Sequence, residues 1–234
     1  MLHRFELHCH SWYSADAADS PEDLIARARA QGLSGLAITD HNTCDAAAYL
    51  ESQGLLRPDG LPVEGFLVIP AVEVSTADGH LICLGVTLPN RVGVPAVEVA
   101  KEIRARGGVP IPAHPYDRWR AGIREEVLDQ LPIRVIEVFN AAVTSREYNV
   151  AAHQYAAARG LVGMAGSDAH HASAIGTAVT ALELESLSVA NVLAQIEIGA
   201  ALEERYLNRW EGVKKHFGNW FRVFNRRPKP EPSN

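Results

Sequence analysis

Cysteine is scarce in this chain, and no stretch of it is long and apolar enough to cross a bilayer. The three cysteines, Cys9, Cys44 and Cys83, are odd in number and show no CxxC spacing, which argues against a disulfide framework and a structural zinc knuckle. No uncharged run approaches the roughly 18 residues that a membrane-spanning helix needs, and the first residues lack the apolar core of a signal peptide. We therefore expect a soluble, cytoplasmic protein.

Basic residues are also under-represented over most of the chain. The sequence has 22 Lys and Arg against 28 Asp and Glu, but eight of the 22 fall within residues 205–230 beside a single acid. The remainder holds 14 basic and 27 acidic residues, a net charge of −13. Such a body repels a nucleic-acid backbone unless cations or local arginines reverse the field. A small anionic substrate is the easier partner.

The chain does contain a regular alternation of short apolar β-rich runs and segments of helical period. At 234 residues and 47% hydrophobic content, one domain can bury a full core. The alternation predicts repeated βα units in a mainly parallel sheet or barrel. Strands are expected near residues 4–7, 36–39, 66–74, 80–86, 109–112, 135–138, 162–165 and 178–184. Helices are expected near residues 21–31, 45–52, 95–106, 123–130, 145–159 and 188–198.

Histidines and acids follow several of the predicted strands. Because strand ends converge on one face of a parallel barrel, these side chains should become neighbours. Two histidines that merely end a strand would explain the first group alone, but so many histidines and acids on one rim would be costly without cations. The groups are His8-Cys9-His10, Asp40-His41, Glu73, His114 and Asp168-Ala169-His170.

The order of these motifs resembles that of the PHP (polymerase and histidinol phosphatase) hydrolases over about residues 4 to 200. The first motif, Glu6-Leu7-His8-Cys9-His10-Ser11, is followed by Ser14-Ala15-Asp16 and Pro21-Glu22. Glu6 replaces the frequent aspartate, and Asp16 lies one residue later than the acid of other members. Further matches are Ile38-Thr39-Asp40-His41, Pro70-Ala71-Val72-Glu73, Gly79-His80, Pro112-Ala113-His114-Pro115, Ile136-Glu137-Val138-Phe139-Asn140 and Gly166-Ser167-Asp168-Ala169-His170.

The resemblance implies an α/β fold, a distorted (β/α)7 TIM-like barrel, whose rim holds two or three divalent metal ions. Imidazole and carboxylate ligands suit zinc, manganese or iron better than calcium or magnesium. The implied first metal site is His8, His10, Glu73 and Asp168; Glu73 bridges to a second with His80 and His114; Asp16, His41 and His170 hold the third.

The implied activity is metal-dependent hydrolysis of phosphoric esters. Cations polarise a phosphoryl oxygen and lower the pKa of a water, so we expect the nucleophile to be a metal-bound hydroxide held by Glu73, His114 and Asp168. The acidic body favours a small phosphomonoester or nucleotide as substrate. One alternative is an exonuclease-like phosphodiesterase acting on short oligonucleotides. Another, of a different class, is a metal-binding regulatory module with vestigial activity.

A phosphoester substrate also needs groups that bind its remaining oxygens. Arg118 is the main candidate because it closely follows the turn at His114, and arginine suits phosphate geometry. Arg120 and Arg146 are weaker candidates. Asn140 matches a recurring family position and is expected either near the substrate or in a structural role at a strand end.

The C-terminal part of the chain differs from the body. We expect a PHP metallo-hydrolase domain over residues 1–200, a basic amphipathic helical extension over 201–227, and a disordered tail over 228–234, where prolines recur. Aromatic residues spaced by three and four describe one apolar helical face. That helix packs on the body or on a second subunit, giving a homo-oligomer, or lies on a membrane surface or nucleic acid.

Overall fold

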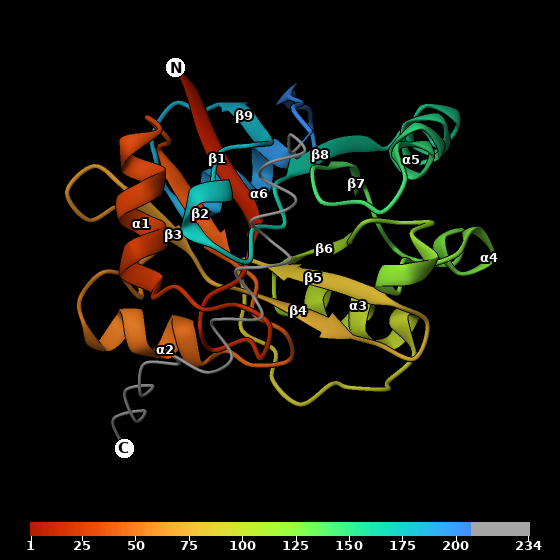
Figure 1. Cartoon of the computed structure of the whole chain (residues 1–234), viewed down its shortest axis with the longest axis horizontal. Helices are drawn as coiled ribbons and strands as arrows, with labels where there is room; N and C mark the ends of the chain where they lie inside the picture. Colours follow the sequence, from red (N-terminus) through yellow and green to blue (C-terminus); the bar gives the residue numbers. More distant parts are fainter. Residues whose placement is uncertain (207–234) are drawn as a thin grey trace.

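The computed structural model describes residues 1–206, whose path is coloured along the chain in Figure 1. The predicted alternation of strands and helices is confirmed. The strands are β1 Leu2–Cys9, β2 Gly35–Ile38, β3 Leu67–Ile69, β4 Ala71–Ser75, β5 His80–Leu84, β6 Val109–Pro112, β7 Val135–Asn140, β8 Val162–Gly166, β9 Val179–Glu183 and β10 Ala201–Glu203. The helices are α1 Pro21–Ala30, α2 Asp45–Ser52, α3 Ala96–Ala105, α4 Glu125–Leu128, α5 Arg146–Arg159 and α6 Val189–Ile196, with 3₁₀ turns η1 Arg118–Arg120 and η2 Ala172–Ala174.

The strands form three sheets, so the α/β class is confirmed but a closed, mainly parallel barrel is not found in residues 1–206. The sheet orders are β10-β9-β1-β2-β3, β4-β5-β6 and β7-β8. Strands β1, β2 and β3 run parallel, as do β7 and β8. The β4-β5-β6 sheet is antiparallel, and β9 runs antiparallel to both β1 and β10. The link between β4 and β5 is a tight turn, which is too short for a parallel crossover.

The single strand expected over residues 66–74 is divided at Pro70. Strand β3 pairs with β2, whereas β4 pairs with β5. Proline has no N–H to donate to a sheet, so the chain can change partners there. Two isolated bridges then join the sheets, one between Cys9 and Ala169 and one between His41 and Glu73. These bridges bring the ends of β1, β2 and β8 close to β4.

The apolar interior lies between the sheets and the helices that cover them. Phe5, Leu7, Ile82 and Met164 are all fully buried in one cluster, although they come from strands of three different sheets. Figure 1 shows α1 and α2 on the side of β1–β3, and α3 beside β4 and β5. Burying apolar surface from all three sheets in one core stabilises the arrangement that sets the strand ends in place.

A strand directly follows the domain boundary expected at residue 200. Residues 201–203 form β10, which pairs with β9, so the folded body continues beyond it and the extension does not begin as a helix. The rest of the helix expected up to residue 227, and the tail over 228–234, lie outside the described residues. Within residues 1–206, no helix is both long enough and apolar enough to cross a membrane.

Candidate metal centre

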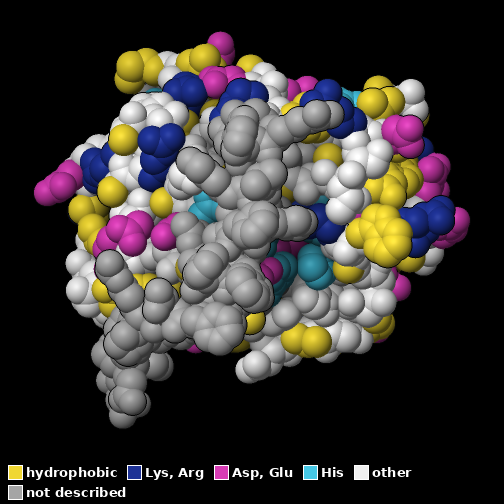
Figure 2. All heavy atoms as spheres, in the orientation of Figure 1, with side chains coloured by type: hydrophobic (Ala, Val, Ile, Leu, Met, Phe, Trp, Pro, Cys, Tyr) yellow, Lys and Arg dark blue, Asp and Glu magenta, His cyan; other side chains and the backbone are white. Residues whose placement is uncertain are grey.

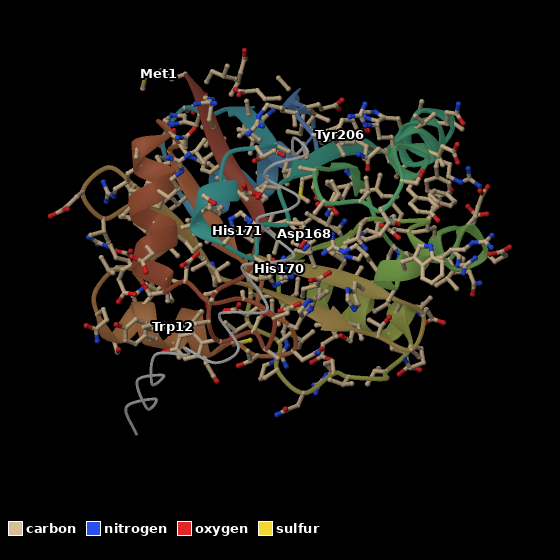
Figure 3. All side chains as sticks on the ribbon, in the orientation of Figure 1. Met1, Trp12, Asp168, His170, His171 and Tyr206 are labelled. Carbon is tan, nitrogen blue, oxygen red and sulfur yellow. The ribbon has the colours of Figure 1, made fainter. Side chains whose placement is uncertain are left out.

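All nine residues expected to bind metal lie together where strands of the three sheets meet. Figure 2 shows histidine and acidic side chains gathered in a hollow of the molecule, and Figure 3 places Asp168 and His170 near its middle, on the loop after β8. The loops or ends of β1, β2, β6 and β8 and the strands β4 and β5 supply His8, His10, Asp16, His41, Glu73, His80, His114, Asp168 and His170.

The Glu73 carboxylate lies between two sets of imidazoles. It is fully buried within β4. Its Oε2 is 3.4 Å from Nε2 of both His8 and His10. Its Oε1 is 3.1 Å from Nε2 of His114 and 3.0 Å from Nδ1 of His80. A carboxylate with each oxygen facing a separate group of ligands has the arrangement needed to bridge two cations.

Several buried polar atoms in this group have no hydrogen-bond partner among the described residues. His10 Nε2 and Asp168 Oδ1 are 3.3 Å apart, yet neither makes a hydrogen bond within residues 1–206. The Nδ1 atoms of His41 and His80 also make none there. Buried polar atoms nearly always find a partner. Four such atoms beside Glu73, all of them nitrogen or oxygen ligands, fit divalent cations that favour imidazole and carboxylate.

Asp16 belongs to an outer and more exposed group. Its Oδ2 is 3.0 Å from His170 Nε2 and 3.5 Å from His41 Nε2, and 46% of its side chain is exposed. His41 also turns its Nδ1 to Glu73 Oε2, at 3.2 Å. The family resemblance assigned His41 to the third site alone, whereas the geometry lets it connect the outer group to the inner one.

Hydrogen bonds at Nδ1 fix the orientation of two of the histidine rings. His8 Nδ1 is 2.9 Å from Glu137 Oε1, and His170 Nδ1 donates to the backbone carbonyl of Asp168 at 2.9 Å. A ring that donates through one nitrogen presents the lone pair of the other. Both rings therefore direct Nε2 at the ligand group.

Glu137 and Asn140 brace the centre from behind. Glu137 Oε2 accepts hydrogen bonds from the backbone N–H of His114 at 2.6 Å and from Asn140 Nδ2 at 3.1 Å. Asn140 is fully buried, also donates to Asp168 Oδ2 at 3.0 Å, and accepts from Ala142 N at 2.9 Å. Asn140 thus orients two acids, which is one of the two roles that the sequence left open for it.

A different arginine from the favoured one reaches the centre. Arg118 is exposed on η1, whereas Arg120 Nη1 lies 2.5 Å from Asp168 Oδ2 and donates to the carbonyl of Ala142 at 3.2 Å. Arg146 instead lies over the ring of Tyr206, 4.3 Å from its centroid. The sequence carries no local signal that separates two arginines two residues apart, because the shape of the turn decides which one points inward.

Charge and burial act in opposite directions on the central acids. Burial alone would raise the pKa of Glu73, but the neighbouring imidazoles, His8 first, hold it well below its usual range. Burial likewise opposes ionisation of Asp168, while Arg120 and His8 hold its pKa well below normal. Both carboxyls are therefore ionised, which is the form that binds cations.

Within residues 1–206, Glu6, the residue that replaces the family's usual aspartate, has no such cationic partner. Burial raises its pKa to about 7. Its Oε1 accepts from the backbone N–H of Ser167 at 3.0 Å, and its Oε2 from Gly176 N at 3.2 Å. Glu6 thus anchors the loop that carries Asp168.

Two of the expected ligand residues have a backbone conformation that residues other than glycine rarely adopt. The φ angles of His114 and Asp168 are 31° and 52°. Left-handed backbone at such residues costs free energy and occurs where surrounding contacts enforce it. Here those contacts include hydrogen bonds from His114 N to Glu137 and from Asp168 N to the carbonyl of His8, at 2.6 and 2.8 Å.

Comparison with known proteins connects this chain to one family. The PHP domain matches residues 6–111, and the PHP-associated region matches residues 146–201. An uncharacterized protein of Methanocaldococcus jannaschii is 28% identical over 146 residues, which are 58% of this chain and 81% of that protein.

Solved structures share the fold at low sequence identity. PsfC from Pseudomonas syringae has a TM-score of 0.71 at 17% identity, covering 94% of this chain and 98% of that one. The lesion-specific endonuclease Q of Pyrococcus furiosus has a TM-score of 0.68 at 14% identity, covering 100% of this chain and 74% of that one. Together with the nine converging side chains, these similarities lead to one conclusion: the chain contains a PHP domain over residues 6–111 and a PHP-associated region over residues 146–201.

Proposed function

We propose that this chain is a metal-dependent phosphoesterase that hydrolyses a small phosphorylated substrate, either a phosphomonoester or a nucleotide. The observation that carries the proposal is the buried Glu73 carboxylate, whose two oxygens face separate sets of imidazoles at 3.0–3.4 Å. Bound zinc, manganese or iron ions would supply positive charge that polarises a phosphoryl oxygen and lowers the pKa of a water. The proposed metal-binding residues are His8, His10, Asp16, His41, Glu73, His80, His114, Asp168 and His170.

The protein's own groups have separate tasks in this proposal. Glu73, His114 and Asp168 surround the place of the attacking water. Arg120, whose guanidinium lies beside Asp168, places a fixed positive charge next to an anionic phosphoryl group. Arg118, which is exposed on the same turn, is available to the outer part of the substrate.

Charge favours a small substrate over a long nucleic acid. Outside residues 205–230 the chain has 27 acidic and 14 basic residues, and this net negative charge opposes the phosphate contacts that dominate nucleic-acid affinity. The second candidate is an exonuclease-like phosphodiesterase acting on short oligonucleotides. The shared fold with a lesion-specific endonuclease favours that candidate. A regulatory module with vestigial activity fits less well, because none of the nine expected ligand residues is missing.

Metal analysis and a substrate panel test the proposal together. We would measure the metal content of the purified protein and its hydrolysis of phosphomonoesters, nucleotides and short oligonucleotides, before and after chelation. Two or three ions per chain with chelator-sensitive phosphate release are expected. Turnover of oligonucleotides alone would favour the second candidate, and bound metal without turnover would favour the regulatory module. A metal-free protein after purification with added metal would overturn the site.

A further inference from the structure

We propose that Trp119 is a stacking surface for a planar aromatic ring in the substrate, so that nucleotides are preferred over phosphomonoesters that lack such a ring. The inference rests on the proposed function and narrows its substrate class. Trp119 is 83% exposed and is the one aromatic residue among the large exposed hydrophobic residues of positions 1–206. Single exposed apolar side chains are common, so the argument depends on where this one is held.

The turn that carries Trp119 is fixed to the fold by Asp117. The Trp119 N–H donates to Asp117 Oδ1 at 3.1 Å. The same carboxylate accepts from Thr144 Oγ1 at 2.8 Å and from Thr144 N at 2.9 Å. Asp117 is fully buried. A buried, ionisable side chain with several hydrogen bonds holds its turn rigidly. The backbone that carries the exposed indole therefore has a fixed position.

The same turn is attached to three of the proposed metal-binding residues. A Cβ on Gly122 would lie 2.4 Å from the carbonyl oxygen of His114, so the two backbones are in close contact there. The His80 N–H donates to the carbonyl of Ala121 at 2.8 Å. Arg120, the next residue after Trp119, contacts Asp168. These contacts fix the position of Trp119 relative to the metal centre.

This position suits the organic part of a nucleotide. Trp119 directly precedes Arg120, whose guanidinium contacts Asp168. Because consecutive Cα atoms are about 3.8 Å apart, the indole is attached to the backbone next to that arginine. Figure 2 shows hydrophobic and basic side chains adjoining the hollow that contains the histidines. A phosphate at the centre, beside Arg120, would leave its nucleoside directed outward along η1. An indole face stacks on any base, and the neighbouring exposed Arg118 can add a cation–π contact.

A kinetic comparison of two substrates tests the stacking role. With metal-loaded protein, Trp119→Ala should raise KM for a nucleoside 5′-monophosphate by roughly 10-fold, in line with the loss of one stacked base, and change kcat little. Both constants for glycerol phosphate should stay the same. Trp119→Phe should restore most of the affinity, and Leu61→Ala, at another exposed apolar position, should have no effect. An unchanged KM for the nucleotide, or an equal rise for glycerol phosphate, would overturn the inference.

A binding measurement separates this inference from the proposed function. Nucleoside monophosphate should quench part of the intrinsic tryptophan fluorescence, and Trp119→Phe should remove that part while leaving the other three tryptophans of the chain in place. Quenching without any hydrolysis would reject the phosphoesterase and retain the stacking surface. Hydrolysis of nucleotides with neither quenching nor a KM effect would reject the stacking surface and retain the phosphoesterase.

Discussion

The inner ligand group around Glu73 and the outer group around Asp16 are held in different ways. Glu73 lies within β4, opposite Ile82 of β5, and its side chain is fully buried. Asp16 lies in the loop between β1 and α1, and nearly half of its side chain is exposed. Ligands on strands are positioned more accurately than ligands on loops. Water also weakens charge interactions at exposed groups far more than at buried ones.

The difference indicates an order of metal affinity. Cations beside Glu73 would meet ligands already fixed by the sheet and by Glu137, whereas a cation beside Asp16 would have to order an exposed side chain, at a cost in entropy. His41 touches both groups, so occupancy of the outer site would add to an inner centre that is already formed. We therefore expect two tightly bound ions and one weaker ion.

The largest expected effect comes from Glu73→Gln. The amide keeps the shape of the side chain but removes the negative charge shared by both inner sites, so both inner ions should be lost. Activity should fall by more than roughly 100-fold, which is the upper end of the loss when a residue that only hydrogen-bonds to a metal ligand is removed. Elemental analysis and phosphate release measure the two effects. Glu183→Gln, at an exposed position on β9, is the matched control. Retention of two ions and full activity would remove the bridging role.

A smaller effect is expected from Glu137→Gln. Glu137 is not one of the proposed metal-binding residues, but it orients His8 and accepts a hydrogen bond from the backbone of His114. Loss of such a partner typically lowers metal affinity or activity by roughly 10- to 100-fold. Titration with a competing chelator measures the affinity, and Glu126→Gln on the exposed face of α4 provides the control. Unchanged affinity would show that the ring of His8 is oriented by packing alone.

Asp16→Asn should affect only the outer group. We expect the third ion to bind roughly 10-fold more weakly or not at all, by analogy with other losses around metal ligands, while two ions remain. Stoichiometry across a range of free metal concentrations tests this expectation. Asp59→Asn has a similar side-chain exposure, 48% against 46%, and should leave every ion in place. Loss of all ions in the Asp16 variant would contradict the separation of the two groups.

The sequence predicted which side chains converge better than it predicted the sheets that carry them. His8 lies on β1 and His10 directly follows its last residue, and the alternation of side chains along extended backbone directs both toward Glu73. The link between the strands ending at Ser75 and beginning at His80 is too short for a parallel crossover. That spacing signals an antiparallel pair, so this departure from the mainly parallel sheet could have been predicted from the sequence itself.

Other features depend on tertiary contacts that no local pattern reveals. The inward direction of Arg120 follows from the 3₁₀ turn and from the left-handed backbone of Ala121, whose φ is 53°. Alanine carries no preference for that conformation. The burial of Asn140 between Glu137 and Asp168 likewise depends on β7 and β8 being adjacent.

The smallest expected effect contrasts the inner and outer positions within a single turn. Arg118→Ala removes an exposed guanidinium, and because exposed charges contribute at most about 1 kcal/mol, KM for a phosphomonoester should rise by less than about fivefold. Arg120→Ala removes the charge beside Asp168, where a hydrogen bond to a charged group is worth about 1.5–3 kcal/mol, and should raise KM more. KM measured in parallel for the two variants shows which arginine contributes more to phosphate binding. A larger effect at Arg118 would mean that the phosphate binds at the outer edge of η1 and that Arg120 serves only to position Asp168.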